Sequence, residues 1–178
     1  MATRKTVRRL DSLLTVVGIA CLALACKAAP EVLVEPEPSA RPAPSSPRRL
    51  DKVRLVDPPA NGDVEAAVRG ALLQAETDER HLVVYVGAKW CEPCQRFHHA
   101  AERGELDATF PDVDFLTFDA DHDSERLTSA GYVSKYIPLF ALPKPDGSAS
   151  GQQIEGGVKG EGAVANITPR LQNLLGIP

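Results

Sequence analysis

The prolines of this 178-residue chain are unevenly distributed, and their distribution limits where a folded domain can lie. Eight of the fifteen prolines fall between residues 30 and 59, in a segment with few large apolar side chains. Such a segment cannot bury enough apolar surface to offset the entropy lost on ordering, and its prolines favour extended polyproline conformations. We therefore interpret residues 26–59 as a semi-rigid tether and expect one folded domain over residues 60–178.

The N-terminal segment has the pattern of a cleaved targeting sequence. Four basic residues lie within positions 4–9, and an uncharged stretch rich in Leu, Val and Ala covers residues 12–26. A cationic start, a short apolar region and small residues before a cleavage site are typical of a signal peptide. The apolar stretch is shorter than the roughly 20 residues that a membrane-spanning helix needs. We expect residues 1–25 to be a signal peptide, with an uncleaved anchor as the weaker alternative.

The apolar stretch ends in Leu22-Ala23-Leu24-Ala25-Cys26. This sequence resembles the lipobox of bacterial lipoproteins, although the family prefers Leu where Ala23 stands. The resemblance implies that Cys26 is lipidated, that the mature protein is anchored to a membrane by this lipid, and that it lies in the periplasm. Lys27 after the cysteine favours the outer membrane. The alternative is ordinary cleavage near Ala25 or Ala29.

Charge and cysteine content exclude several classes of protein. The chain has 20 Lys and Arg against 24 Asp and Glu, a formal charge of −4 that becomes −7 once residues 1–25 are removed. No basic excess indicates a nucleic-acid partner. Four cysteines are too few for a disulfide scaffold. If Cys21 is removed and Cys26 is lipidated, Cys91 and Cys94 are the only free thiols.

From residue 61 onward the apolar residues become periodic, with helical spacing alternating with short continuous runs. The last helix contains Pro169, which we expect to kink it. A βαβ unit followed by a hairpin predicts an α/β fold with one mixed sheet and helices on both faces. The expected elements are a helix over 62–78, a strand over 81–86, a helix to about 103, a strand over 113–118, a helix over 124–130, a strand over 137–142, a weaker strand near 153–154 and a helix from 164 to the C-terminus.

The motif Trp90-Cys91-Glu92-Pro93-Cys94 lies where the first expected strand meets the following helix. Cys91 falls at the helix N-terminus, where free N–H groups and the helix dipole favour a thiolate. Cys94 lies one turn further on, close enough for a disulfide but more shielded. A Cys-x-x-Cys in this context is typical of a redox site.

These residues, with Asp121 after the second strand and Ile137-Pro138 further along, resemble the thioredoxin superfamily over about residues 62–176. The resemblance implies a thioredoxin-like fold, a redox-active disulfide between the catalytic cysteines Cys91 and Cys94, and a cis peptide bond before Pro138. It also implies substrate binding by Trp90, Ile137 and Pro138. The longer segment after Cys94 is more similar to the periplasmic C-terminal domain of DsbD-type reductases than to short thioredoxins.

The chain departs from the family at the positions that serve the second cysteine. A buried Asp often lies six residues before the first cysteine in the family, and Tyr85 stands there instead; the Lys that often accompanies this Asp is replaced by Thr117. Glu92 is expected to oppose ionisation of Cys91 and Lys89 to favour it. The deprotonation of Cys94 therefore needs another group, for which Glu92 or a water is a candidate.

We expect a monomeric protein-disulfide reductase or isomerase of the cell envelope. Its partners are substrate proteins with disulfides and a membrane electron donor, and it needs no cofactor or metal because the chemistry belongs to its own sulfurs. Glu-Pro between the cysteines is closer to the Gly-Pro of reducing thioredoxins than to the Pro-His of the oxidant DsbA, which remains the alternative direction.

Other functions remain open. Cys91, Cys94 and His98, with His99 or His122, suit copper or zinc by ligand type. The fold is also compatible with a tethered binding module without turnover, and the cysteines with a purely structural disulfide. Three alternating aspartates lack the Gly and Glu of a calcium loop, so we expect them to cap the helix at Ser124; these are Asp119, Asp121 and Asp123.

Overall fold

The structure is a computed structural model that describes residues 52–178. The expected signal peptide, the expected lipidation site Cys26 and most of the expected tether lie outside these residues. Among the residues that the structure describes, no helix has both the length and the apolar character needed to cross a membrane.

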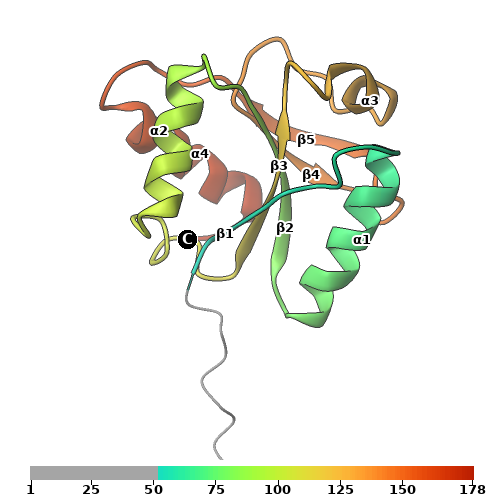
Figure 1. The fold of residues 1–178 in the computed structure, drawn as a ribbon. Helices are drawn as coiled ribbons and strands as arrows, with labels where there is room; N and C mark the ends of the chain where they lie inside the picture. Colours follow the sequence, from blue (N-terminus) through green and yellow to red (C-terminus); the bar gives the residue numbers. More distant parts are fainter. Residues whose placement is uncertain (1–51) are drawn as a thin grey trace, which may run out of the picture. The chain divides into compact units, whose positions relative to one another are not determined.

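A five-stranded mixed sheet forms the centre of the domain, with the strand order β1-β3-β2-β4-β5 (Figure 1). β1, β3 and β2 run parallel, whereas β4 is antiparallel to both β2 and β5. The βαβ unit followed by a hairpin, expected from the sequence, is therefore confirmed. The strands are β1 (Arg54–Val56), β2 (His81–Gly87), β3 (Val113–Asp119), β4 (Leu139–Pro143) and β5 (Ala149–Glu155).

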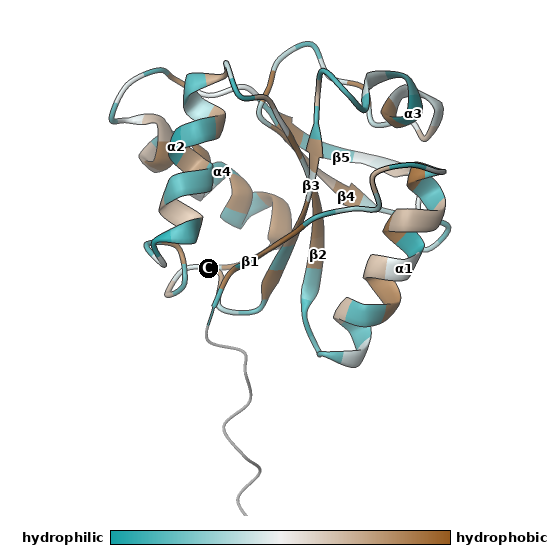
Figure 2. Ribbon diagram, in the orientation of Figure 1, coloured by the Kyte–Doolittle hydropathy of each residue, from teal (hydrophilic) through white to brown (hydrophobic). Residues whose placement is uncertain are grey.

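Strand β2 is a continuous apolar run because both of its faces are buried. Leu82, Val84 and Val86 point to one face and belong to the core beneath α1 (Val64–Thr77) and α3 (Ser124–Ser129). The alternate residues Val83 and Tyr85 belong to the core beneath α2 (Glu92–Glu102) and α4 (Ala163–Leu175). Both faces of the sheet are covered by helices, as expected, so alternation of polar and apolar residues is absent from this strand. Figure 2 shows the hydrophobic strands between partly hydrophilic helices.

The few aromatic side chains gather mainly on the α2 and α4 face. Phe97, Phe115 and Phe140 pack with their ring centroids 4.7 to 6.0 Å apart. Tyr85 stacks on Phe140 with a centroid distance of 5.0 Å. Aromatic side chains bury large areas, so this cluster fixes α2 firmly on the sheet, and α2 carries the cysteines at its start.

Strand β1 corrects the domain boundary expected from the sequence. The sequence pattern places residues 54–56 in the tether, but they pair in parallel with residues 114–116 of β3. Arg54 also donates two hydrogen bonds to Asp114, at 2.7 and 2.5 Å. The folded domain therefore begins before residue 60.

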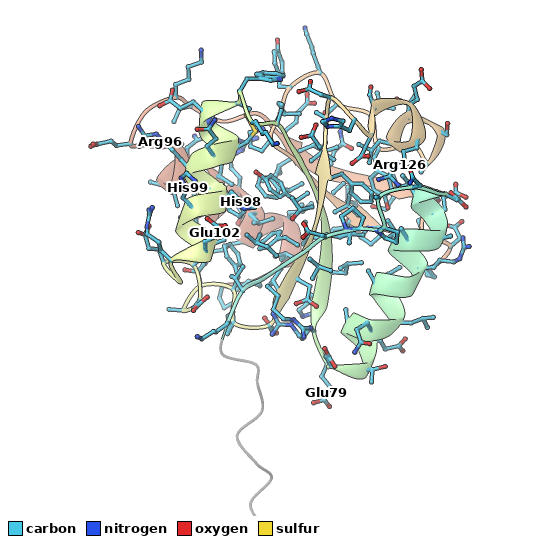
Figure 3. All side chains as sticks on the ribbon, viewed as in Figure 1. Glu79, Arg96, His98, His99, Glu102 and Arg126 are labelled. Atoms are coloured by element: carbon cyan, nitrogen blue, oxygen red, sulfur yellow. A yellow bond between two sulfur atoms is a disulfide. The ribbon has the colours of Figure 1, made fainter. Side chains whose placement is uncertain are left out.

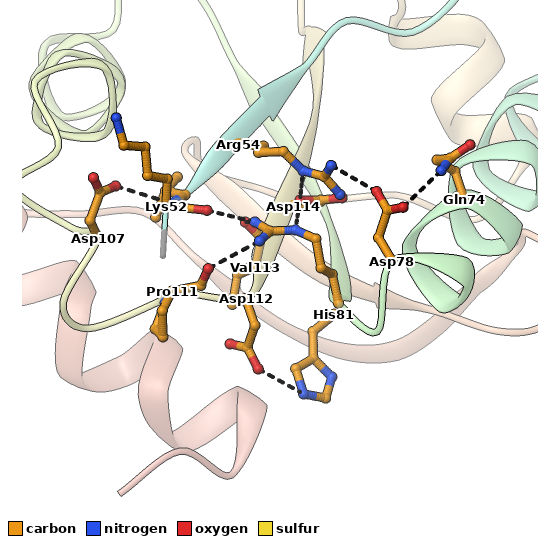
Figure 4. A network of polar contacts seen from close by, with 12 residues as sticks. Lys52, Arg54, Gln74, Asp78, His81, Asp107, Pro111, Asp112, Val113 and Asp114 are labelled. Carbon is orange, nitrogen blue, oxygen red and sulfur yellow. Dashed lines mark hydrogen bonds and ion pairs between the residues drawn. The ribbon is translucent and has the colours of Figure 1, made fainter. Parts of the chain in front are cut away.

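A network of polar contacts around Asp114 stabilises this edge of the sheet (Figure 4). The Arg80 side chain is 1% exposed and donates to Asp114 Oδ1 at 2.5 Å. It also donates to the carbonyl oxygens of Lys52, Pro111 and Val113 at 2.7 to 3.0 Å. The positive charge thus has both an ion-pair partner and several hydrogen-bond acceptors, which a buried arginine requires.

The start of β4 differs from the expectation, and the position of Pro169 within the last helix agrees with it. Ile137 and Pro138 precede β4 instead of forming its start, because β4 begins at Leu139. Pro169 lies inside α4, which is continuous from Ala163 to Leu175.

Candidate active site

Cys91 and Cys94 lie at the N-terminus of α2 and are joined by a disulfide bond. Cys91 is the N-cap residue, and its sulfur accepts a hydrogen bond of 3.3 Å from the backbone N–H of Cys94. Free N–H groups and the positive end of the helix dipole favour a thiolate at this position. Cys94 is the more shielded of the two, with 2% of its surface exposed against 5% for Cys91. Both observations agree with the placement expected from the sequence.

The segment before β4 brings Ile137 and Pro138 beside the cysteines. Ile137 packs against the small apolar cluster formed by Ala88, Cys91 and Cys94. The peptide bond between Ile137 and Pro138 is cis, as expected. The Pro138 carbonyl accepts a hydrogen bond from the Gly156 N–H, whereas the backbone N–H and carbonyl of Ile137 have no hydrogen-bond partner among residues 52–178.

Trp90 is exposed and oriented by an acidic neighbour. Trp90 is 67% exposed, and its indole Nε1 donates a hydrogen bond of 2.9 Å to Asp121 Oδ2. Asp121 lies in the loop after β3, so this contact links that loop to the cysteine motif. Trp90, Asp121, Cys91 and Ile137 all line one groove of about 810 Å³.

A second, smaller hollow lies on the side of Cys94. It has a volume of about 450 Å³, and Tyr85, Lys89 and Thr117 are among its lining residues. Cys91 lines only the large groove and Cys94 only the small hollow. The two cysteines thus line different cavities, and Lys89 lines the same one as Cys94.

Tyr85 occupies the place where the family often has a buried Asp. Its hydroxyl donates a hydrogen bond of 3.1 Å to the carbonyl oxygen of Cys94. Burial raises the pKa of this hydroxyl well above its ordinary value, so it remains protonated at neutral pH and is no base. Its contact with α2 was not foreseen, although the sequence marked the position as unusual.

The carboxylate of Glu92 accepts hydrogen bonds both from its own helix and from a loop far away in the sequence. It accepts 3.1 Å hydrogen bonds from Arg96 Nε and from the backbone N–H of Gly160. The hydrogen bond from Arg96 lowers the pKa of Glu92, which is therefore ionised at neutral pH. Glu92 thus ties the loop between β5 and α4 to the cysteine motif.

Two of the three histidines considered as metal ligands, His98 and His122, lie close to carboxylates. His98 and His99 lie on α2 (Figure 3), and His98 Nε2 is 3.3 Å from Glu102 Oε1. His122 Nδ1 is 3.2 Å from Asp119 Oδ1. Within residues 52–178, no group of three or more His, Cys, Asp or Glu side chains is placed to hold a metal ion.

The three aspartates near Ser124 serve the loop instead of capping α3 with a side chain. Asp123 is the N-cap residue, but no helix N–H donates to its carboxylate. The Asp123 carboxylate instead accepts from the Asp119 N–H at 2.9 Å and from Arg126 Nε at 2.9 Å. The expected side-chain cap is therefore wrong, because Arg126 and the loop backbone occupy the carboxylate.

Neither protein-family models nor curated protein sequences match this chain. Among solved structures, thioredoxin O1 from Arabidopsis thaliana is 24% identical, with 70% of this chain and 96% of that chain covered and a TM-score of 0.43. A poplar thioredoxin h is 22% identical, with 70% and 96% covered and a TM-score of 0.44. The thioredoxin of Trichomonas vaginalis is 22% identical, with 71% and 97% covered and a TM-score of 0.43.

The fold class follows from the chain's own features. The mixed sheet covered by helices on both faces, the cysteine pair at the N-terminus of α2 and the cis peptide bond beside it are all present. These features give this chain the thioredoxin-like fold expected from the sequence, with a Cys91–Cys94 pair joined by a disulfide.

Proposed function

We propose that the protein is a thiol-disulfide oxidoreductase that reduces or isomerises disulfides in substrate proteins. The observation that carries this proposal is the position of Cys91: it caps α2, it is disulfide-bonded to Cys94, and it borders a large groove with the unpaired backbone of Ile137. An extended substrate segment would pair with the Ile137 N–H and carbonyl as an added strand does at a sheet edge.

The reaction needs only sulfur chemistry. The Cys91 thiolate attacks one sulfur of the substrate disulfide, whose S–S bond breaks, and the other substrate sulfur leaves as a thiolate. Cys94 then loses its proton and attacks Cys91 Sγ, which forms the Cys91–Cys94 disulfide and releases the second substrate thiol. Two electrons have passed to the substrate. A dithiol donor must return them, and we assign this role to a membrane electron donor.

We further propose a periplasmic location with a lipid anchor at Cys26, which rests on the N-terminal sequence pattern. The placement of β1 is compatible with it. β1 and β2 are parallel, so residue 54 lies at the opposite end of the sheet from the cysteines that follow β2 (Figure 1). Mass spectrometry of the mature N-terminus tests this: a diacylated Cys26 supports it, and an unmodified N-terminus contradicts it.

Reduction of a protein disulfide, such as those of insulin, tests the proposed activity. The reduced protein should convert insulin to its free chains, and Cys91→Ser should abolish the reaction. Absence of turnover by the wild-type protein, or undiminished turnover by Cys91→Ser, would rule out the proposed function.

A further inference from the structure

Cys94, His98 and Glu102 follow one another at four-residue spacing along one side of α2. Residues at this spacing are neighbours on a helix surface, with Cβ atoms about 5–6 Å apart. Helix side chains also lean toward the N-terminus, which directs Glu102 toward His98 and His98 toward Cys94. His98 Nε2 lies 3.3 Å from Glu102 Oε1, and Figure 3 shows the two residues on successive turns. This row ends at the cysteine that has to lose its proton in the proposed reaction.

His98 and Cys94 also line the same hollow, which has a volume of about 450 Å³. A hollow of this size has room for several water molecules, since each occupies about 30 Å³ in the liquid. Cys94 is only 2% exposed, whereas the side chain of His98 is 36% exposed. His98 therefore lies between the shielded thiol and bulk solvent, and one water is enough to connect it to Cys94.

The contact with Glu102 prepares the His98 ring to accept a proton. The nearby carboxylate favours a proton on Nε2, so Nδ1 carries the lone pair when the ring is neutral. Within residues 52–178, no side chain or backbone group donates a hydrogen bond to His98 Nδ1. Imidazole is the side chain best suited to take up and release protons near neutral pH.

The other ionisable groups of this hollow are poorer proton acceptors. Lys89 is a cation, which favours a thiolate on Cys94 but accepts no proton. Burial opposes the ionised form of Asp119, but hydrogen bonds from two backbone N–H groups lower its pKa overall. Asp57 is exposed, and a solvated carboxylate is too weak a base to hold a proton at neutral pH. His99 lies about 100° further round the helix than His98.

Glu92, the candidate for this proton that the sequence suggested, lies on the other side of the disulfide. It lines the groove of Cys91 and not the hollow of Cys94. The hydrogen bond from Arg96 lowers the pKa of Glu92, which makes it a weaker base. The acceptor for the Cys94 proton therefore has to come from the hollow.

His98 borders further charged groups in a neighbouring cavity. Lys52, Arg103 and Asp107 line that cavity together with His98 and Glu102. In the part of the chain that the structure describes, Glu102 is the only carboxylate within ion-pair distance of the His98 ring. Glu102 is therefore the charged group that orients this ring.

We propose that His98 accepts the proton of Cys94, through a water in the hollow, when Cys94 resolves the mixed disulfide, and that Glu102 positions His98. The S–H bond of Cys94 breaks and the proton passes to His98 Nδ1. The electron pair left on Cys94 Sγ forms the bond to Cys91 Sγ, the bond between Cys91 and the substrate sulfur breaks, and the substrate leaves as a thiolate. His98 then returns the proton to solvent. The proposal rests on the proposed function, because it names a further residue of the same reaction.

The test measures the two steps of the reaction separately with dithiobis(nitrobenzoate), a disulfide whose coloured thiolate is released once at each step. The reduced full-length chain carries Cys21→Ser and Cys26→Ser, so that Cys91 and Cys94 are its only thiols, and it is in excess over the reagent. Attack by Cys91 releases the first coloured thiolate, and resolution by Cys94 releases the second. Stopped-flow absorbance gives both rates between about pH 5 and pH 9.

With His98 present, the rate of the second step should rise with pH and level off above about pH 7, where imidazole is mostly neutral. His98→Gln should slow this step about 100-fold at about pH 7, the low end of the range for a general base, and should abolish the plateau. Glu102→Gln should slow it between about 2-fold and 5-fold, as for an exposed ion pair. The first rate should stay unchanged in both variants, because neither residue lines the groove of Cys91.

His81→Gln is the matched control. His81 also has a carboxylate nearby, with Nε2 3.8 Å from Asp112 Oδ2, but it begins β2 at the end opposite the cysteines. It should leave both rates unchanged. An unchanged second rate in His98→Gln would overturn the proposal. An equal loss in His81→Gln would overturn it too, as would a loss in His99→Gln or Asp57→Asn in place of His98→Gln.

Failure of the proposed function gives a different result. If the chain with His98 intact releases no second thiolate and does not reduce insulin, Cys91 and Cys94 are no exchange pair and both proposals fall. If that chain reduces insulin while His98→Gln resolves the mixed disulfide at the same rate, only the proton transfer to His98 is overturned.

Discussion

The hydroxyl of Tyr85 donates a hydrogen bond of 3.1 Å to the carbonyl oxygen of Cys94 in the first turn of α2. Tyr85 comes from the central strand β2 and stacks on Phe140 of β4. The sheet thus contacts the helix turn that carries the cysteines through a buried polar group, the Tyr85 hydroxyl. The hydroxyl holds the backbone of Cys94, and because burial raises its pKa it stays protonated and is no base for the Cys94 thiol.

Removal of this hydroxyl should destabilise the protein. Tyr85→Phe keeps the ring and its stacking but deletes the hydrogen bond, so we expect the free energy of unfolding to fall by about 1 kcal/mol. In a Cys91→Ser background, loosening of the first turn should also raise the alkylation rate of Cys94 about five-fold. Denaturant unfolding and timed alkylation measure the two effects.

Tyr132→Phe is the matched control. Tyr132 is also buried, and its hydroxyl donates to the Gly147 carbonyl at 2.8 Å, at a site that does not involve the cysteines. We expect a similar loss of stability without faster alkylation of Cys94. Faster alkylation in both variants would show that Tyr85 has no specific effect on the cysteine turn.

The same tyrosine should affect stability at alkaline pH. Burial raises the pKa of Tyr85 above its ordinary value of about 10. Above that pH the unfolded chain loses the proton while the folded chain retains it, so the free energy of unfolding falls as pH rises. Tyr85→Phe should reduce this slope by up to about 1.4 kcal/mol per pH unit. Urea unfolding in steps above about pH 10 measures the slope, and parallel curves for the two proteins would refute the assignment.

The contact between Trp90 and Asp121 should matter for substrate binding. Asp121→Ala frees the indole and should raise KM for a protein disulfide between about 2-fold and 5-fold, with a smaller change in kcat, because a hydrogen bond contributes about 1 kcal/mol. Asp121→Asn retains an acceptor oxygen and should stay close to wild type. If Asn and Ala have equal effects, the negative charge and not the hydrogen bond is responsible.

Truncation should distinguish the observed domain boundary from the expected one. A chain that starts at residue 52 retains β1 and the Lys52 carbonyl that Arg80 binds. A chain that starts at residue 60 loses both, together with the ion pair of Arg54 and Asp114. We expect the shorter chain to be less stable by at least about 3 kcal/mol, since it strips partners from a buried charged cluster. Thermal unfolding compares the two, and equal stability would mean that β1 is dispensable.

Local patterns were sufficient to predict most of the domain. The helix expected over 62–78 is α1 (Val64–Thr77), and the strand expected over 113–118 is β3 (Val113–Asp119). The helix has a strong apolar periodicity, and the strand is a buried apolar run. β1 was missed because it has only three residues next to two prolines, and its stability comes from β3 and Asp114, about 60 residues away in sequence.

Those parts of the site whose residues lie close together in the sequence could be predicted from it. The cysteine pair and its position at the start of α2 follow from one short motif. The wall of the groove does not, because it is assembled from distant segments: Glu92 binds the N–H of Gly160, 68 residues later. Asp123 was placed correctly before α3, but its partner could not be predicted, since Arg126 and the backbone of Asp119 compete for its carboxylate.

Trapping of the mixed disulfide tests most directly whether Cys91 is the attacking thiol. Reduced protein with Cys94→Ser lacks the resolving sulfur, so incubation with insulin should yield a covalent adduct on Cys91 that mass spectrometry locates. The Cys91→Ser variant keeps only the more shielded cysteine of the pair, Cys94, and should yield no adduct. An adduct on Cys94, or no adduct with either variant, would contradict the assignment of Cys91 as the nucleophile.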